Sequence, residues 1–286
     1  MENDMLMLNR YGFFDSPYEL SSKGYTGSDR MSVQQLVFMS AVFAALIIAS
    51  VLLRNRKKIL FVIYRVMAIL MPVLEIIKIV FSSYHDIKNG QPFNWGGILP
   101  FYTCSMLLYF LPVLAWGKGK WKEYSAAFFT TVGLVAGLTN FVYLSAAGWY
   151  PLFTYGCLHS VLFHAALVFV GLSLMISGEY IPQIKTFYKG MYPVLLFSAF
   201  VIPINFIVKH TTQDTWVDYM LLMNCNGLPV IGDFAGLLSS KGLTIVFTLI
   251  MLFVAYPLAT FLITLIDSGF VSLVGFFSDF GSRKQD

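Results

Sequence analysis

The residues best suited to chemistry in this chain are a cysteine and two histidines set among apolar residues. Cys104 lies in the apolar segment 98–116, and His159 and His164 lie in the apolar segment 152–177. A neutral imidazole within hydrogen-bond reach can take the proton of a thiol and later deliver a proton to a leaving alkoxide. Such a pair supports two-step acyl transfer through a thioester. A buried thiol is more often a small apolar side chain, so acyl transfer is one option among several.

Only one of the two histidines can face the cysteine from a straight helix. They are five positions apart, which corresponds to about 140° around a helix. By depth His159 lies nearer to Cys104, whereas His164 is about 18 Å along its helix and near mid-membrane. The choice between them therefore stays open at the level of spacing.

Four more polar groups lie in apolar segments, where they are costly and indicate a functional site. Glu75 and Lys78 are one helical turn apart and can form an ion pair that merely fixes its helix. Asn140 and Asn205 can join helices through hydrogen bonds. Glu75, Asn140 or Asn205 could instead orient a catalytic histidine.

The composition predicts that most of the chain lies in a membrane. Of its 286 residues, 57% are hydrophobic and 12% are charged, whereas soluble domains average about 25% charged residues. Pro100 and Pro112 are expected to kink or break the third apolar segment. We predict an all-α polytopic transmembrane helical bundle of about seven spanning helices. The apolar segments long enough to span are 31–53, 59–82, 98–116, 124–146, 152–177, 191–209 and 243–266.

Lysines and arginines in the short loops predict that the N-terminus is outside and the C-terminus inside. Residues 1–30 are expected to form a polar extramembrane segment and 31–267 the transmembrane domain. Within that domain, 210–242 is expected to be an outer loop that folds back as a lid, and 268–286 an interfacial C-terminal segment. In this orientation the polar groups gather in the outer half of the bundle, and only Arg65 lies near the inner end.

Several short segments carry a family resemblance. Residues 99–105 read Leu-Pro-Phe-Tyr-Thr-Cys-Ser, which resembles the Leu-Pro-Leu-His-Leu-Cys-Ser signature of the transmembrane-protein-164 family and its bacterial YwaF-type relatives. The likeness extends from Arg65 to Glu75, to Phe-His-Ala-Ala-Leu at 163–167, and to Asn205. It continues at 218–221, which read Asp-Tyr-Met-Leu where the family tends to read Asn-Tyr-Met-Phe-Leu. This sequence departs from the family pattern in having a tyrosine at position 102 and an aspartate at position 218.

The resemblance implies a phospholipid acyltransferase that works through a cysteine and is independent of acyl-CoA. The animal member moves polyunsaturated acyl chains from diacyl phospholipids onto lyso-ether phospholipids, so membrane phospholipids and lysophospholipids are the expected substrates. The resemblance places the acyl carrier at Cys104 and the catalytic histidine at His164. The supporting or alternative residues are His159, Glu75, Asn205, Asn140 and Tyr219.

Other functions compete with this one. Water could accept the acyl chain in the same site, which would make the protein a lipid hydrolase. The androgen-induced fatty-acid-ester hydrolases, which are distantly similar, use a Thr and His pair for acyl chemistry. In this sequence Thr103 is next to Cys104 but would point about 100° away from it. A binding or transport protein could use Glu75 and Lys78 as ligand groups, with Cys104 incidental, and a regulatory partner in a larger membrane complex is a further alternative.

Some partners and cofactors are excluded or left open by the sequence. A net charge of +4 without a long basic run argues against nucleic acid. No metal or cofactor is expected, because three closely spaced ligands are not apparent. The expected location is a bacterial cytoplasmic membrane, with the site open to the outer side. The oligomeric state, lipid headgroup and acyl length stay open.

Overall fold

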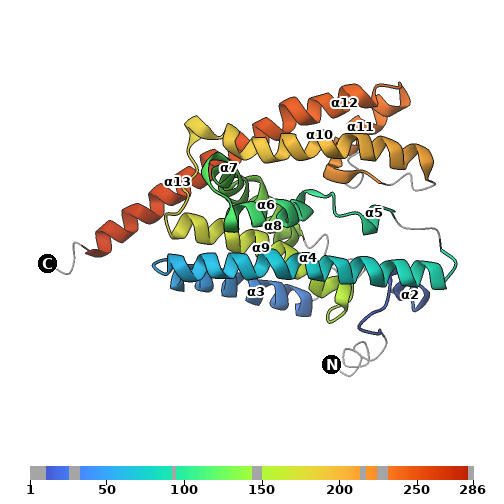
Figure 1. Ribbon diagram of the computed structural model, residues 1–286, viewed down its shortest axis with the longest axis horizontal. Helices are drawn as coiled ribbons and strands as arrows, with labels where there is room; N and C mark the ends of the chain where they lie inside the picture. Colours follow the sequence, from blue (N-terminus) through green and yellow to red (C-terminus); the bar gives the residue numbers. More distant parts are fainter. Residues whose placement is uncertain are drawn as a thin grey trace.

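The structure is a computed structural model that describes residues 11–25, 33–91, 95–143, 150–212, 217–223 and 231–282 (Figure 1). Within these ranges its regular structure is entirely helical, which confirms the predicted all-α class. The long helices are α3 (Val33–Leu52), α4 (Lys57–Lys88), α9 (Tyr155–Ile176), α10 (Tyr188–Thr211) and α13 (Tyr256–Ser282). The short helices are α2 (Pro17–Ser22), α5 (Trp95–Ile98), α6 (Met106–Trp116), α7 (Gly119–Thr130), α8 (Val132–Tyr143), α11 (Ile231–Ser240) and α12 (Thr244–Ile250). Three 3-10 turns, η2 (Thr103–Ser105), η4 (Ile184–Thr186) and η5 (Tyr219–Leu221), and a π-helical turn, η6 (Met251–Ala255), complete the described structure.

The described residues contain five helical stretches that are long and apolar enough to cross a membrane, rather than about seven. These stretches are Val33–Leu52, Lys57–Lys88, Tyr155–Ile176, Ile184–Thr211 and Thr244–Gly269. The two remaining predicted segments, 98–116 and 124–146, are each interrupted. The break in the third segment agrees with the expected effect of Pro100, whereas the break in the fourth was not predicted from the sequence.

Backbone chemistry explains both interruptions. Helix α5 ends at Ile98, and Pro100 follows, which has no N–H and keeps the residue before it out of the helical region. Tyr102 is extended, with φ −75° and ψ 162°, before η2 and α6 begin. The second interruption is at Thr131, where φ is −124° and ψ is −98° and the hydroxyl donates to the Ala127 carbonyl at 2.6 Å. Pro112, by contrast, lies inside the continuous helix α6.

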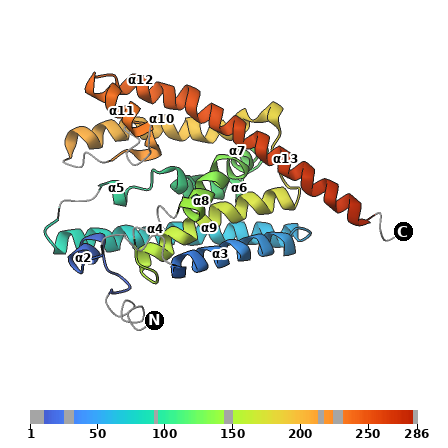
Figure 2. The same ribbon diagram turned by 180° about the vertical axis from the view of Figure 1, so that it is seen from behind.

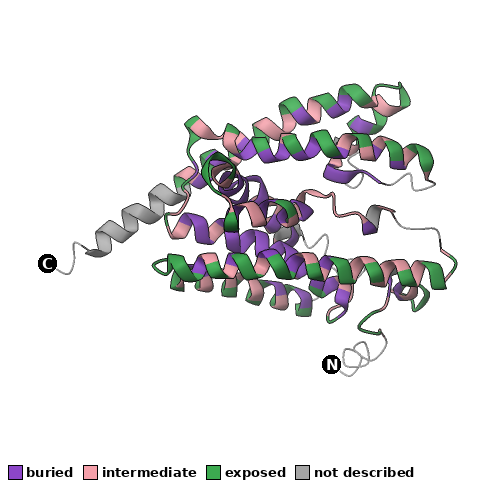
Figure 3. Cartoon of the chain, viewed as in Figure 1, coloured by how far each residue is buried: buried purple, intermediate pink, exposed green. Residues whose placement is uncertain are grey.

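The helices form three layers (Figures 1 and 2). Helices α3 and α4 form one outer layer, α6 to α9 the middle layer, and α10 to α12 the other outer layer. In the most apolar stretch of α9, 72% of the residues are buried, against 17% in α3 and 28% in α4 (Figure 3). The outer helices therefore expose apolar side chains such as Val66, Ile69 and Ile76 of α4. An exposed apolar surface on long helices is typical of an integral membrane protein.

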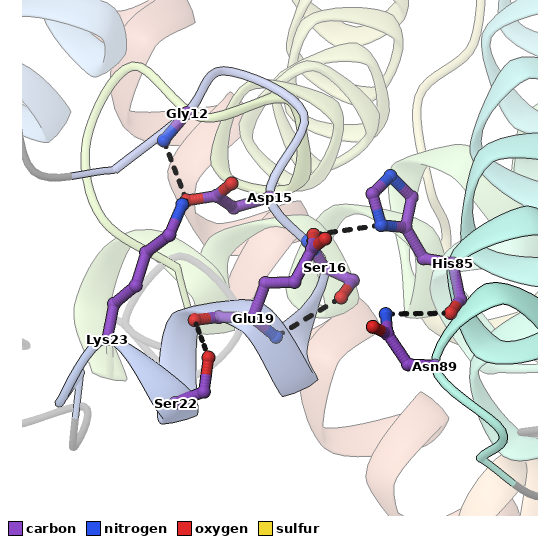
Figure 4. Close-up of polar contacts among 8 residues, drawn as sticks. All are labelled: Gly12, Asp15, Ser16, Glu19, Ser22, Lys23, His85 and Asn89. Atoms are coloured by element: carbon purple, nitrogen blue, oxygen red, sulfur yellow. Dashed lines mark hydrogen bonds and ion pairs between the residues drawn. The ribbon is translucent and has the colours of Figure 1, made fainter.

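Part of the predicted polar N-terminal segment is folded against the ends of α4 and α9. Ser16 and Glu19 form a reciprocal capping box at the start of α2, with bonds of 3.3 and 3.0 Å (Figure 4). The Glu19 carboxylate also lies 2.8 Å from Nδ1 of His85, near the end of α4 (Figure 4). The Phe13 carbonyl accepts a hydrogen bond from the backbone N–H of Tyr155, the first residue of α9, at 2.7 Å. Residues 1–10 and 26–32 lie outside the described residues.

The segment boundaries predicted after residue 209 fall within helices or next to them. Helix α13 is a single helix across the boundary expected between residues 267 and 268. The expected lid at 210–242 contains the end of α10, the turn η5 and the helix α11. Its residues 213–216 and 224–230, including Cys225, lie outside the described residues, as do 283–286.

Candidate active site

Cys104 lies in the short turn η2, between the extended residues that follow α5 and the start of α6. This turn packs against α8 and α9. Cys104 is partly exposed, whereas Cys157 is only 2% exposed. Cys104 therefore lies at the edge of the helix packing, whereas Cys157 lies inside it.

The structure brings the side chains of Cys104 and His164 close enough to interact. The Nδ1 atom of His164 lies 2.7 Å from the carbonyl oxygen of Ser160, one helical turn earlier. A carbonyl oxygen only accepts, so Nδ1 carries the hydrogen and donates it. The other ring nitrogen, Nε2, is then the acceptor that remains for the Cys104 thiol.

His159 has a different partner. Its Nε2 lies 2.8 Å from Oε2 of Glu75 on α4, and its ring stacks on Phe163 at 4.3 Å. The other oxygen of Glu75, Oε1, lies 2.5 Å from Nζ of Lys78. Glu75 is only 3% exposed, so these contacts form a buried charged cluster between α4 and α9. Glu75 therefore holds His159 and does not orient His164.

The direction of each side chain, rather than its depth, decides which histidine is beside the cysteine. Helix α9 packs against α4 and also against η2. The spacing of five residues turns His159 toward Glu75 and His164 toward Cys104. The two clusters are neighbours, because Lys78 interacts electrostatically with Cys104 and His159 with His164.

Asn205 and Tyr219 support the cysteine-bearing loop without joining the Cys104–His164 pair. The Asn205 side-chain amide donates to the Tyr219 carbonyl at 3.0 Å, and its oxygen accepts from the Tyr219 N–H at 2.9 Å. The Tyr219 hydroxyl donates to the Trp95 carbonyl at 2.5 Å. Its ring lies edge-on to the rings of Phe101 and Tyr102, with centroids 5.5 and 5.3 Å away. Asn205 thus fixes Tyr219, and Tyr219 packs on the residues just before Cys104.

The turn that carries Tyr219 is unusual in its backbone. Met220 and Leu221 have positive φ values of 61° and 52°, a region that non-glycine residues rarely occupy. One carboxylate oxygen of Asp218 accepts hydrogen bonds from the N–H groups of Leu222 and Met223 at 2.9 and 2.8 Å. The Tyr256 hydroxyl donates to the Met220 carbonyl at 2.6 Å. Asp218 therefore stabilises this buried turn through the backbone.

The profile of the TMEM164 family matches residues 30–260 of the chain. The chain belongs to the TMEM164 family. The match contains Cys104, His164 and all the supporting residues predicted from the sequence, and it confirms the family that the short segments predicted. No curated protein matches the chain, and no solved structure matches it.

Sequence reasoning missed two residues that position His164 in this TMEM164-family protein. Ser160 supplies the carbonyl that fixes the imidazole, and its place one turn before His164 was the available signal. Gly137 of α8 brings the two helices close together: a Cβ atom there would lie 2.9 Å from the His164 carbonyl oxygen. The signal for that contact was the pair Gly133 and Gly137, four residues apart, a spacing typical of close helix packing in membranes.

Two other expectations concern this part of the chain. Asn140 is fully buried in α8, one turn beyond Gly137. Among the described residues, no group of three or more His, Cys, Asp and Glu side chains is arranged to hold a metal ion.

Replacing Glu75 with leucine is expected to destabilise the TMEM164-family fold strongly. The change leaves Lys78 and His159 without their shared carboxylate, and breaking a buried ion pair on one side costs about 3–5 kcal/mol. The measurement is the unfolding midpoint of the purified protein in detergent. Glu75→Gln, which keeps hydrogen-bonding capacity, should fall between leucine and the wild type.

The control for this prediction is an ion pair at the other end of the same helix. Lys57 pairs with Glu179 at 2.7 Å, and the Lys57 side chain is 57% exposed. Because exposed pairs contribute only about 0–1 kcal/mol, Glu179→Gln should hardly move the midpoint. Equal, small shifts in Glu75→Leu and Glu179→Gln would show that the Glu75 cluster does not stabilise the fold.

Proposed function

We propose that this protein is a membrane-embedded phospholipid acyltransferase in which Cys104 carries the acyl chain as a thioester. The observation that supports it most directly is the placement of the His164 imidazole beside the Cys104 thiol, with Nδ1 of His164 held by the Ser160 carbonyl. This arrangement has the parts of an activated nucleophile: a thiol, a base, and a group that orients the base.

In the first half-reaction, Nε2 of His164 takes the thiol proton as the Cys104 sulfur attacks the ester carbonyl of a phospholipid. The carbon–sulfur bond forms, and the ester carbon–oxygen bond then breaks. The leaving lysolipid alkoxide receives the proton from the His164 imidazolium, so the lysolipid departs neutral at that oxygen. The products are an acyl thioester on Cys104 and a free lysophospholipid.

In the second half-reaction the same groups act in reverse order. His164 takes the proton of an acceptor hydroxyl, and the acceptor oxygen attacks the thioester carbonyl. The carbon–sulfur bond breaks, and the Cys104 thiolate recovers a proton from the imidazolium. With a lysophospholipid as acceptor the net reaction is transacylation, which requires no acyl-CoA.

We also propose seven membrane crossings, with two of them broken. The interrupted stretches α5–α6 and α7–α8 would supply the crossings that the five long helices do not. An odd number of crossings puts the termini on opposite sides, in agreement with the loop charges, which favour an outer N-terminus and an inner C-terminus. In this topology Cys104 opens toward the outer side of a bacterial cytoplasmic membrane.

The proposal is tested with the full-length protein in lipid nanodiscs that contain a phospholipid with a labelled acyl chain. Intact-protein mass spectrometry should find one labelled acyl adduct, located at Cys104 and removed by hydroxylamine. Adding a lysophospholipid should move the label into a new diacyl product. The absence of both adduct and product would contradict the proposal. Release of free labelled fatty acid with no labelled acceptor would replace transacylation with hydrolysis at the same thiol.

A further inference from the structure

A second polar region lies where α4 begins and α6 ends (Figure 1), away from the Glu75 cluster near the middle of α4. A cavity of about 640 Å³ opens there, and its lining contains five cationic side chains and no carboxylate. The cations are Lys57, Lys58, Arg65, Lys118 and Lys122. The sequence predicted Arg65 to lie apart from the other polar groups of the membrane segments. The cavity explains its position, because Arg65 lines it together with four lysines.

The cations of this basic cavity are largely uncompensated within the described part of the chain. Lys57 pairs with Glu179, and Lys122 lies over the Phe61 ring, 4.1 Å from its centroid. Lys58, Arg65 and Lys118 form no ion pair among the described residues. Like charges gathered around one cavity repel each other unless an anion lies between them.

The backbone adds further positive potential to the basic cavity. Helices α4 and α7 both begin beside it, and their N-terminal neighbours Arg56 and Lys118 form no side-chain capping bond. The first N–H groups of a helix lack partners within the helix and carry a partial positive charge. Two such helix starts and five cations together favour an anion with several acceptor oxygens, such as a phosphate.

The remaining lining favours a lipid over a free anion in water. Phe61, Val62 and Trp116 line the cavity together with the cations, and Trp116 is exposed. Tryptophan and lysine with apolar neighbours are typical of the membrane–water interface. A phospholipid could place its headgroup phosphate among the cations and its acyl chains along the apolar lining. Since Arg65 lies ten residues before Glu75, about 15 Å along α4, this is a different place from the Cys104 site.

We propose that the basic cavity binds the phosphate group of an anionic membrane lipid. The Arg65 guanidinium already donates one N–H, from Nε, to the Ala115 carbonyl at 3.4 Å, at the end of α6. The bond directs the guanidinium to the α6 end of the cavity and leaves its Nη groups for phosphate oxygens. The loop charges predict that this end faces the cytoplasm, so the lipid comes from the cytoplasmic leaflet.

Cationic residues in loops also set the orientation of a protein in the membrane. Lys120 serves as a control that separates this general role from binding of a lipid in the cavity. Lys120 lies between Lys118 and Lys122 in the sequence and is exposed, but it does not line the basic cavity. If the attraction is only a diffuse surface charge, Lys120 contributes as much as Lys118. If the cavity is a site, Lys118 contributes and Lys120 does not.

The test uses native mass spectrometry of the full-length protein in detergent, with equal amounts of phosphatidylglycerol and phosphatidylcholine of distinct mass. The protein should retain one phosphatidylglycerol in preference to phosphatidylcholine. Arg65→Gln combined with Lys58→Gln should weaken that binding by about tenfold or more, since hydrogen bonds to charged groups are each worth more than neutral ones. Lys120→Gln should leave binding unchanged.

Three results would overturn the assignment. Equal retention of the two lipids would show that the cavity does not select an anionic headgroup. Equal loss in Lys118→Gln and Lys120→Gln would show a diffuse surface effect. Displacement of the lipid by millimolar inorganic phosphate would make the ligand a free phosphate. Lys58→Gln with Lys118→Gln, both at exposed positions, serves as the second variant should Arg65→Gln disturb the end of α6.

Discussion

Replacing Cys104 with alanine is expected to abolish both the acyl adduct and acyl transfer. The thiol is the only group in the proposed mechanism that bonds to the acyl carbon, so its removal closes the covalent route. Loss of a catalytic nucleophile commonly lowers the rate by a factor of roughly a thousand or more. The measurement is the initial rate of label transfer from phospholipid to lysophospholipid in nanodiscs, together with the intact mass of the protein.

A second cysteine provides the matched control for this variant. Cys157 also lies on the membrane part of the chain but is buried, in a small apolar cluster with Met39 and Val161. Cys157→Ala should keep the adduct, the transfer rate and the unfolding midpoint close to wild type. Full transfer by a folded Cys104→Ala protein would show that Cys104 does not carry the acyl chain. Loss of transfer in Cys157→Ala but not in Cys104→Ala would make Cys157 the acyl carrier.

Sequence chemistry was sufficient for the features that depend on local rules. The excess of apolar residues predicted helices with lipid-facing surfaces. Pro100 and Pro112 predicted a kink or break in the third segment, and the helical structure is broken at Pro100 but continuous at Pro112. The short motifs were sufficient for the family, and the family profile matches residues 30–260, which contain all of them. The resemblance also singled out His164, and the structure has that residue beside the thiol.

The contacts between helices were beyond sequence reasoning. Depth placed Glu75, His159 and Asn205 at one level with Cys104 and suggested one shared centre. The structure separates them, because the facing direction of each helix depends on packing that periodicity leaves undetermined. Glu75 meets His159 across the α4–α9 contact, and Asn205 meets the backbone of Tyr219. Likewise, no proline lies at the break at Thr131, so the sequence contained no local signal for it.

The polar groups around the thiol therefore divide into two kinds of support. Glu75, Lys78 and His159 join α4 to α9, and α9 carries His164. Asn205 and Tyr219 hold the residues that precede Cys104. Cys104 and His164 come from different parts of the chain, and each part is fixed by its own buried network. In the proposed mechanism only two side chains react, and the polar residues on the other helices would hold them in position.

Replacing His164 with glutamine is expected to lower acyl transfer by about 10²–10⁴-fold, the usual contribution of a positioned acid–base group. Glutamine can still contact the Cys104 thiol but cannot accept its proton. The residual rate should then rise with pH, because only the ionised thiol is nucleophilic once no neighbouring base takes its proton. A purely structural role for His164 would lower the rate without changing the shape of this pH profile.

His159→Gln is the control that separates the roles of the two histidines. His159 lies on the same helix as His164, but its substitution removes a contact with Glu75 rather than one with Cys104. This change should lower the unfolding midpoint while the pH profile of transfer keeps the wild-type shape. A pH profile altered in His159→Gln and unchanged in His164→Gln would make His159 the base. The proposed mechanism requires the opposite, because Nε2 of His164 is the nitrogen that the Ser160 carbonyl leaves free to take the Cys104 proton.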